Sequence, residues 1–196
     1  MKTFEFLYDY GSPAAYLAWA RLDDLEARTG AKAVRTPVLL GGIFQSTGNS
    51  APITVPLKGK YLFVDLARWA KKFGTPLQMN PQFPINTLNF MRAAVGLQLR
   101  EPERLAAFDA AMFHAMWRDA KPMADLATVA QVLAEAGFDP QAIMALASDP
   151  EVKEQLKTNT AHAVERGAFG APTFFVGSEM FWGQDRLDFV EEALRK

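Results

Sequence analysis

The sequence has no cysteine and only two histidines, His114 and His162. Without cysteine, the chain can form no disulfide bond, no thiolate metal site and no dithiol that carries electrons. Two histidines are also too few for a multi-histidine metal centre. Any thiol chemistry on this protein therefore requires a thiol that comes from a bound molecule.

The sequence also lacks an excess of charge of one sign and a long apolar run. The 21 Lys and Arg residues nearly balance the 22 Asp and Glu residues, so no overall field attracts nucleic acid or an anionic membrane. No zinc-spaced cluster or basic–aromatic groove indicates nucleic-acid binding. No apolar segment approaches the ~20 residues that span a bilayer, and the N-terminus lacks the apolar run of a secretory signal. We expect a cytoplasmic protein with neither nucleic-acid nor membrane partners.

The first forty or so residues have the pattern of a strand–helix–strand unit. Residues 3–8 are rich in aromatic side chains and have the length of one strand. Residues 14–28 follow a helical period that ends at Thr29–Gly30, and residues 33–40 are typical of a second strand, with Pro37 at an edge or a bulge. So short a unit indicates two parallel strands joined by a right-handed crossover.

The rest of the chain is mostly helical, apart from one long loop and two short strands. Residues 41–59 are rich in glycine and proline, and we expect a loop there. Apolar periodicity predicts helices over residues 61–73, 86–99, 102–117, 126–136, 140–147 and 150–167. Strands at 169–177 and 179–182 follow, with a tight turn at Gly177–Ser178, and Asp185 is expected to cap a last helix over 186–196.

The order of these elements is β-α-β, a block of helices and then α-β-β-α. Connection rules place the strands of the two ends in one sheet. A chain of 196 residues suits one domain or one domain with an insertion. The sequence therefore predicts an α/β fold in which a three-layer sheet domain, residues 1–45 and 150–196, is interrupted by an all-helical domain, residues 46–149.

The junction between the first strand and the first helix has the residues of a tight helix start. Gly11 allows a sharp turn, Ser12 is a good N-cap and Pro13 suits the first helical position. The Ser12 hydroxyl would lie among unpaired N–H groups at the positive end of the helix, a place that stabilises a phosphate, a carboxylate or a thiolate. Capping alone would also explain Ser12, so both interpretations stay open.

Four stretches in this order resemble motifs of the thioredoxin superfamily. They are residues 9–13 (DYGSP), 48–61 (GNSAPITVPLKGKY), 169–173 (FGAPT) and 181–186 (FWGQDR). The whole chain resembles the branch with a helical insertion, which includes disulfide oxidoreductases of the DsbA type, kappa-class glutathione transferases and 2-hydroxychromene-2-carboxylate isomerases. Ser12 and Ala15 stand where the oxidoreductases have two cysteines, which excludes dithiol chemistry. The resemblance implies a thioredoxin-like domain that binds glutathione, and a homodimer.

The resemblance also implies a set of site residues, with Ser12 as the catalytic residue that holds the glutathione sulfur as a thiolate. The implied glutathione-binding residues are Ser12, Asn49, Lys58, Ala171, Pro172, Trp182, Gly183, Gln184 and Asp185. Pro172 is expected to be cis, so that the backbone of Ala171 can pair with the cysteinyl amide of glutathione. No metal ligand is implied.

The two ends of glutathione would be bound by different parts of this set. Asn49 and Lys58 would reach the glycyl carboxylate, whereas Gln184 and Asp185 would bind the γ-glutamyl end. Each residue also has an ordinary explanation. Asn49 can hold a turn, Lys58 can be solvated, and Asp185 can cap a helix without any ligand.

The activity implied by the resemblance is a glutathione-dependent cis-trans isomerase. It would convert 2-hydroxychromene-2-carboxylate to trans-o-hydroxybenzylidenepyruvate in the degradation of naphthalene-type aromatic hydrocarbons. Residues 181–186 favour this activity, but residues 49–61 and 86–92 fit a kappa-type transferase or peroxidase equally well, and a non-catalytic glutathione-binding protein stays open. The substrate would be a small aromatic acid in an apolar cleft between the domains. Candidate contacts for the ring and the carboxylate are Trp69, Phe90, Trp117 and Arg92.

Overall fold

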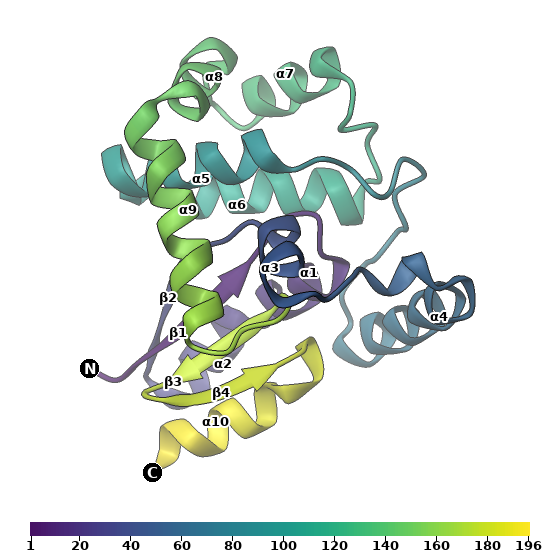
Figure 1. Cartoon of the computed structure of the whole chain (residues 1–196), viewed down its shortest axis with the longest axis vertical. Coiled ribbons are helices and arrows are strands. Elements are labelled where there is room, and N and C mark those ends of the chain that lie inside the picture. Colours follow the sequence, from purple (N-terminus) through teal and green to yellow (C-terminus); the bar gives the residue numbers. More distant parts are fainter.

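The computed structural model describes residues 1–196 and is built around one mixed sheet of four strands (Figure 1). The strands are β1 (Thr3–Tyr8), β2 (Lys32–Pro37), β3 (Thr173–Val176) and β4 (Glu179–Trp182). Their order in the sheet is β2-β1-β3-β4. β1 and β2 are parallel, as the sequence predicts, and β3 is antiparallel to both β1 and β4. The two ends of the chain therefore share one sheet.

Helices cover both faces of this sheet and form a separate block beside it (Figure 1). They are α1 (Pro13–Trp19), α2 (Leu22–Thr29), α3 (Leu40–Thr47), α4 (Pro56–Phe73), α5 (Leu88–Arg100), α6 (Leu105–Phe113), α7 (Leu126–Glu135), α8 (Pro140–Ser148), α9 (Pro150–Glu165) and α10 (Leu187–Arg195). No helix is both long and apolar enough to cross a membrane.

The alternation of side chains along β1 explains the three layers. Phe4 and Phe6 point to the face covered by α1, α2 and α10, where they join the main hydrophobic core. Leu7 points to the opposite face and packs with residues of α3 and α9, among them Ile43 and Ala163. On the first face, the rings of Phe6 and Phe174 stack across β1 and β3 with centroids 5.3 Å apart. This arrangement is the predicted thioredoxin-like three-layer domain.

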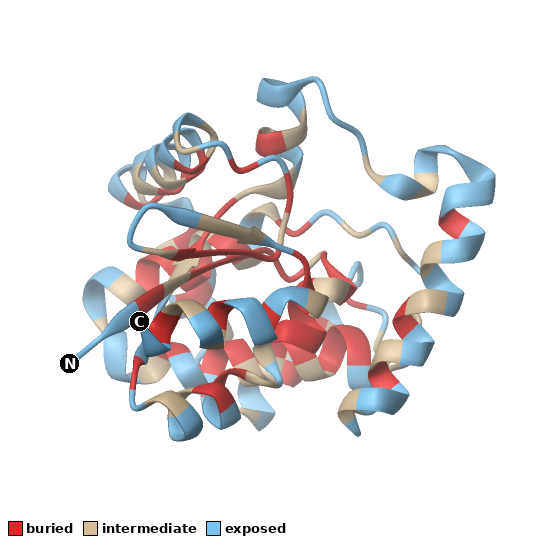
Figure 2. Ribbon diagram, turned by 90° about the horizontal axis from the view of Figure 1, so that it is seen from below, coloured by how far each residue is buried: buried red, intermediate tan, exposed pale blue.

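The helical block between β2 and α9 is packed directly onto the sheet. One continuous core contains sheet residues such as Tyr8 together with Met91 of α5 and Phe113 of α6. Figure 2 shows the buried residues gathered between the sheet and the helices on either side of it. The fold is therefore a thioredoxin-like domain with a helical insertion, as predicted. The boundaries 1–45, 46–149 and 150–196 stay a prediction.

Residues 41–59 differ from the predicted loop. They contain α3, a 3₁₀ turn at Pro52–Thr54 and the start of α4, which begins at Pro56 rather than at residue 61. The start of α3 is stabilised from a distance, because the Leu39 N–H donates to Thr160 Oγ1 at 3.0 Å and the Leu40 N–H donates to Asp9 Oδ2 at 2.9 Å. Neither acceptor is close in sequence, so the local pattern could not indicate this helix.

The helix predicted over 14–28 is divided into α1 and α2 at residues 20–21. The two parts pack against different neighbours: α1 contacts α4, whereas α2 contacts β2 and α10. The change of direction lets Leu22 and Leu25 reach the sheet side of the core. The helix predicted over 102–117 is likewise divided, into a 3₁₀ turn at Pro102–Arg104, α6 and a π-helical turn at His114–Arg118.

Candidate active site

Ser12 lies at the start of α1 and is 5% exposed. Its hydroxyl oxygen accepts a hydrogen bond from the Ala15 N–H at 3.1 Å, and Pro13 occupies the first turn, so the predicted N-cap is confirmed. The same hydroxyl donates to the carbonyl oxygen of Ala171 at 2.9 Å. Ser12 is therefore both a helix cap and a neighbour of the loop before β3.

The loop before β3, residues 169–172, contains the cis Ala171–Pro172 peptide bond that the resemblance implies. One side of this loop meets Ser12 through the carbonyl of Ala171. The other side meets the end of β4, because the Gly183 N–H donates to the Pro172 carbonyl at 3.0 Å. The loop thus joins the start of α1 to the segment that precedes α10.

Three aromatic and polar side chains shape the outer side of this loop. The rings of Phe169 and Trp182 lie 4.9 Å apart. A Cβ at Gly170 would come within 2.7 Å of Trp182 Nε1, so only glycine fits beneath the indole. Asn49 Nδ2 donates to the Phe169 carbonyl at 2.9 Å. Asn49 also accepts from the Ser50 N–H at 2.8 Å, so it holds a turn while it contacts the loop.

Gln184 and Asp185 lie in a 3₁₀ turn, Gln184–Arg186, between β4 and α10. The prediction that Asp185 caps the last helix is wrong, because no side chain caps this turn or α10. The Asp185 carboxylate instead pairs with Arg186 at 2.6 Å. It also folds over Gly183, whose φ of +111° and whose close approach to this carboxylate exclude any Cβ. The tight turn directs Asp185 away from the helix N–H groups.

Gln184 and Asp185 line a hollow of about 160 Å³ between α2, α4 and α10. Its other lining residues are Arg21, Arg28, Trp69, Lys72, Phe73, Leu187 and Asp188. The hollow therefore offers both cationic and anionic groups. A zwitterionic amino acid group, with an ammonium and a carboxylate, has the matching charges. Trp69 was expected to contact the aromatic ring of the substrate. It lies in this hollow, with Lys72 Nζ 4.5 Å from the centre of the indole ring.

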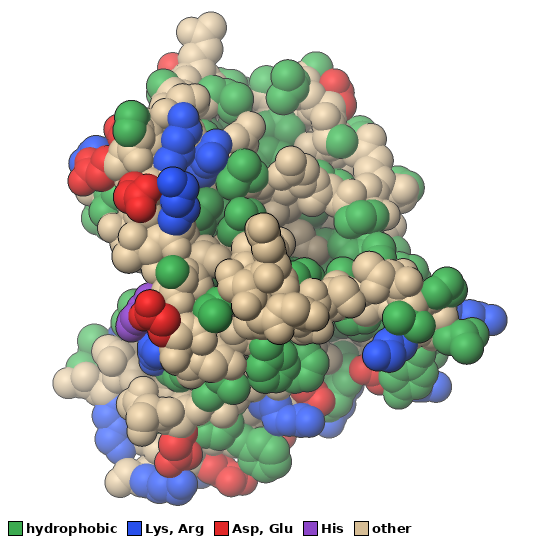
Figure 3. All heavy atoms as spheres, in the orientation of Figure 1, with side chains coloured by type: hydrophobic (Ala, Val, Ile, Leu, Met, Phe, Trp, Pro, Cys, Tyr) green, Lys and Arg blue, Asp and Glu red, His purple; other side chains and the backbone are tan.

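Lys58 stands apart from the residues around the cis-proline loop. It is exposed on the first turn of α4 and has no ion-pair or hydrogen-bond partner within the chain. It lines an open hollow of about 390 Å³ together with Leu57, Tyr61 and Asp65. Figure 3 shows hydrophobic and basic side chains over α4 on the right of the view. The structure therefore brings together Ser12, Asn49, Ala171, Pro172, Trp182 and Gly183, with Gln184 and Asp185 next to them and Lys58 on a separate surface.

Comparisons with known proteins place this geometry in a family. A model of the DSBA-like thioredoxin domain matches residues 3–195. A 2-hydroxychromene-2-carboxylate isomerase of Sphingobium xenophagum is 32% identical, with 98% of each chain covered. A solved structure of a 2-hydroxychromene-2-carboxylate isomerase superposes with a TM-score of 0.86 at 30% identity, covering 98% of this chain and 94% of that one. This chain belongs to the DsbA-like thioredoxin family and, within it, to the 2-hydroxychromene-2-carboxylate isomerase family.

A second group of relatives is more distant. Glutathione S-transferase kappa 1 of Rattus norvegicus is 25% identical, with 98% of this chain and 91% of the rat protein covered. This relative is a glutathione transferase, which agrees with the resemblance of the sequence to the kappa class. The relatives of this isomerase-family chain are therefore enzymes of two activities, and the isomerases are the more similar.

The three other residues expected to contact the substrate are buried to different degrees. Trp117 is fully buried, and its Nε1–H donates to the Tyr10 carbonyl at 2.7 Å, so it belongs to the core rather than to a cleft. Phe90 is partly buried against the same core. Arg92, on α5, has a buried Nε atom without a hydrogen-bond partner, and it takes part in no ion pair.

Asp9 lies directly before the Ser12 turn and was not among the site residues expected from the sequence. Its buried carboxylate accepts hydrogen bonds from the Gly11 N–H at 2.8 Å, from the Leu40 N–H at 2.9 Å and from Thr87 Oγ1 at 2.6 Å. Burial raises the pKa of Asp9, and these hydrogen bonds oppose the shift. Asp9 therefore ties the turn before Ser12 to α3 and α5. The sequence feature that could have indicated this role is the position of Asp9, an acidic residue at the end of an apolar strand and just before the turn.

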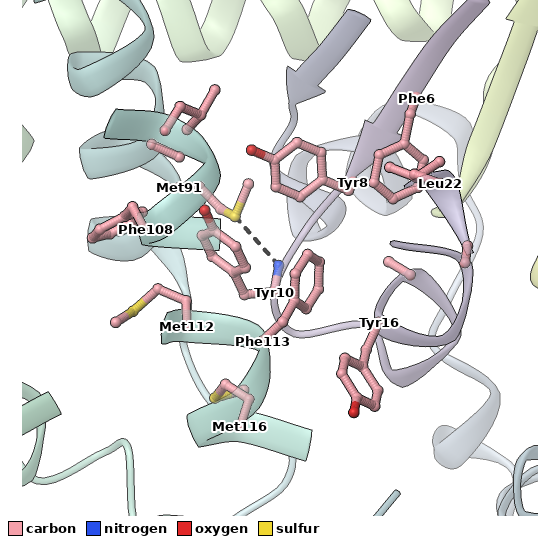
Figure 4. Close-up of a cluster of buried hydrophobic side chains, with 14 of the residues drawn as sticks. Phe6, Tyr8, Tyr10, Tyr16, Leu22, Met91, Phe108, Met112, Phe113 and Met116 are labelled. Carbon is pink, nitrogen blue, oxygen red and sulfur yellow. Dashed lines mark hydrogen bonds between the residues drawn. The ribbon is translucent and has the colours of Figure 1, made fainter. Parts of the chain in front are cut away.

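Asp109 is the second missed residue, and it is fully buried on α6. It accepts from the hydroxyls of Tyr8 at 2.7 Å and Tyr10 at 2.6 Å, and from Arg35 Nη1 at 3.3 Å. Burial raises the pKa of Asp109 to about 6, although all three donors act to lower it. Figure 4 shows Tyr8 and Tyr10 facing α6 in this part of the core. The residues around Asp109 form the apolar face of a helix, so nothing in the local sequence indicated that Asp109 belongs to a buried hydrogen-bond network.

Proposed function

We propose that this protein is a glutathione-dependent isomerase that converts 2-hydroxychromene-2-carboxylate to trans-o-hydroxybenzylidenepyruvate. The observation that carries the proposal is the Ser12 hydroxyl, which lies at the N-terminus of α1 and contacts the cis-proline loop in a chain without cysteine. Similarity to the named isomerases over nearly the whole chain supports the same activity.

The residues around Ser12 fit glutathione. The Ala15 N–H already donates to Ser12 Oγ, which strengthens the hydroxyl as a donor toward a sulfur atom. A charge-assisted hydrogen bond and the helix field together are worth about 2–4 kcal/mol, or about one and a half to three pKa units on the bound thiol. From a usual pKa near ~8.5, this shift makes the thiol mostly ionised at neutral pH. The Ser12 proton would turn from the Ala171 carbonyl to the sulfur, and the carbonyl would become free for a ligand amide.

The ends of glutathione have candidate partners on both sides of Ser12. The γ-glutamyl group, with an ammonium and a carboxylate, suits the hollow in which Asp185 lies near Arg21 and Lys72. We place the glycyl carboxylate beside Asn49, whereas Lys58, which the resemblance also implies for this end, lies on the separate hollow of α4. Trp182 and Gly183 shape the wall between the two ends.

The hemiketal ring of the substrate first opens, as its ring C–O bond breaks to give a phenol and a conjugated ketone. Glutathione would supply a thiolate that adds to the conjugated carbon, with the electron pair held as the enolate. The former double bond can then rotate, and loss of the thiolate restores it in the trans form. The protein's own part is to keep the sulfur ionised and to hold the aromatic acid against it. Ser12 does the first, through its hydroxyl and the α1 N–H groups. We propose that Arg92 does the second by pairing with the carboxylate of the substrate.

The assay that tests this function follows the substrate and the free thiol together. The protein is incubated with glutathione and 2-hydroxychromene-2-carboxylate, and the benzylidenepyruvate product and the thiol are both measured. Isomer formation without loss of thiol is the expected result. Conjugation of a chlorinated aromatic with loss of thiol would favour the kappa-type transferase, which the similarity to the rat protein keeps as the second candidate. Glutathione binding without turnover in either assay would indicate a non-catalytic binding protein.

Replacing Arg92 by leucine should weaken substrate binding. Loss of a charge-assisted pair with a carboxylate raises KM for the aromatic acid by about 10- to 100-fold, while the Kd for glutathione stays unchanged. Steady-state kinetics and calorimetry measure the two quantities. Arg68→Leu is the matched control, because Arg68 is also an arginine without an ion pair but lies exposed on α4. Equal KM values for the two variants would contradict the role of Arg92.

Replacing Asp185 by asparagine should weaken glutathione binding. The loss of one charged partner for the ammonium raises the Kd by about 5- to 30-fold. Isothermal titration calorimetry measures this change directly. Asp188→Asn tests the other carboxylate of the same hollow and is expected to have the smaller effect, since Asp185 is the residue implied by the resemblance. An unchanged Kd for Asp185→Asn would show that its carboxylate only pairs with Arg186.

The wider setting of the enzyme is also part of the proposal. The resemblance implies a homodimer, a cytoplasmic location and a place in the degradation of aromatic hydrocarbons. The exposed apolar side chains of Leu57, Tyr61 and Val64 on α4 are compatible with a contact between subunits. These three expectations stay predictions.

A further inference from the structure

All three polar groups of Tyr10 are bound by side chains of the helical insertion. The Tyr10 N–H donates to the sulfur of Met91 on α5 at 3.4 Å, a contact drawn in Figure 4. The Tyr10 carbonyl accepts from Nε1 of Trp117 at 2.7 Å, and the Tyr10 hydroxyl donates to Asp109 Oδ1 at 2.6 Å. The ring is fully buried and meets Phe113 edge-to-face at 4.9 Å. The backbone of Tyr10 makes no hydrogen bond to the sheet.

Tyr10 is also part of the turn that presents Ser12. β1 ends at Tyr8, so Tyr10 lies beyond the strand and only two residues before Ser12. The turn is closed locally by the Ser12 N–H, which donates to the Asp9 carbonyl at 3.0 Å, and by the Asp9 carboxylate on the Gly11 N–H. The peptide groups on both sides of Tyr10 are therefore oriented by α5 and by the π-helical turn after α6.

We propose that Tyr10 is a positioning residue through which the helical insertion sets the direction of the Ser12 hydroxyl. This inference rests on the proposed function, because Ser12 is taken there to hold the thiolate of glutathione. A hydrogen bond to a developing charge depends strongly on distance and angle, and a displacement of about 1 Å can cost a large factor in rate. Movement of the insertion relative to the sheet would thus change the direction of the Ser12 hydroxyl through Tyr10.

Tyr8 provides a matched control for this role. Its hydroxyl donates to the same oxygen of Asp109 at 2.7 Å, and its ring is equally buried. The backbone of Tyr8, however, belongs to β1, where it lies opposite Pro37, and its carbonyl accepts from the Val38 N–H at 3.0 Å. Tyr8→Phe and Tyr10→Phe therefore each remove one donor from the same carboxylate, but only Tyr10 is connected to the Ser12 turn through its own backbone.

The experiment compares these two variants with the wild type. Glutathione is bound to each protein, and the pKa of its thiol is measured from the ultraviolet absorbance of the thiolate as the pH is raised. Thermal unfolding, kcat and KM are measured in parallel. We expect similar losses of Tm in both variants. Only Tyr10→Phe should raise the pKa of the bound thiol and lower kcat, by about tenfold, with the KM for glutathione within about twofold of wild type.

A second pair of variants keeps the test open if Tyr10→Phe fails to fold. Met91→Leu keeps the side-chain volume but removes the sulfur that accepts from the Tyr10 N–H, and Met112→Leu is its control elsewhere in the same core. Met91→Leu should shift the thiol pKa in the same direction as Tyr10→Phe, whereas Met112→Leu should not. Equal thiol pKa and kcat within each pair would overturn the role of Tyr10. Absence of glutathione binding by the wild type would instead overturn the proposed function, and this inference with it.

Discussion

Replacing Ser12 by alanine should lower turnover by about 10- to 150-fold, which corresponds to the ~1.5–3 kcal/mol of a hydrogen bond to a charged group, because the helix field on the thiolate remains in the variant. The Kd for glutathione should change far less, because the other contacts of glutathione do not involve this hydroxyl. A hydrogen bond that favours the thiolate acts mainly on the reacting form. The measurements are kcat for the isomerisation and calorimetric binding of glutathione.

Loss of the Ser12 side chain also removes a helix cap, which costs about 1 kcal/mol of stability by itself. Asp139→Ala is the control for this effect, because Asp139 caps α8 through the Gln141 N–H at 2.9 Å and lies outside the site. Ser12→Thr keeps a hydroxyl and should retain most of the activity. Turnover in Ser12→Ala equal to that of the wild type would reject the catalytic role, whatever the change in stability.

The stability of the wild type should fall, relative to Asp109→Asn, as the pH rises from about 4 to about 7. Burial raises the pKa of Asp109 from its ordinary 3.8 to about 6. Between these values the folded protein keeps a proton that the unfolded chain has released, so ionisation at higher pH favours unfolding. A shift of about two units corresponds to about 3 kcal/mol that is present at low pH and lost as the pH passes through 6.

Urea unfolding followed by tryptophan fluorescence at a series of pH values measures this change. Asparagine does not titrate, so the difference between the wild type and Asp109→Asn isolates the contribution of the carboxylate. Tyr8, Tyr10 and Arg35 face Asp109 and are present in both proteins. Asp23→Asn is the control, since Asp23 lies 3.9 Å from Arg35 but its side chain is 95% exposed. Parallel stability curves for the wild type and Asp109→Asn would contradict a raised pKa.

Several features of the fold follow from local patterns, and the sequence was sufficient for them. The aromatic run at residues 3–8 is a strand, and the first two strands are parallel. Gly30 and Gly74 end helices in the left-handed conformation. Ser12 with Pro13 begins α1, because a cap and its helix lie within four residues of each other. The cis bond before Pro172 came from resemblance to a family rather than from the local pattern.

Other features depended on contacts between distant parts of the chain. Asp9 and Thr160 stabilise the start of α3, where glycine and proline indicated a loop. The Asp185 carboxylate was expected at a helix cap, but the 3₁₀ turn directs it to Arg186. Local propensity contains no information about such partners, since they become neighbours only when the sheet and the helices pack.

The sequence by itself determined the order of the strands and of most helices, the absence of any thiol in the chain and the place of a serine at a helix start. Only the tertiary structure decided how that serine is held. It brought the Ala171 carbonyl to the Ser12 hydroxyl, and it buried Asp109 between Tyr8, Tyr10 and Arg35. The physical reason is that caps and periodicity act over a few residues, whereas a buried polar network exists only after segments about a hundred residues apart have come together.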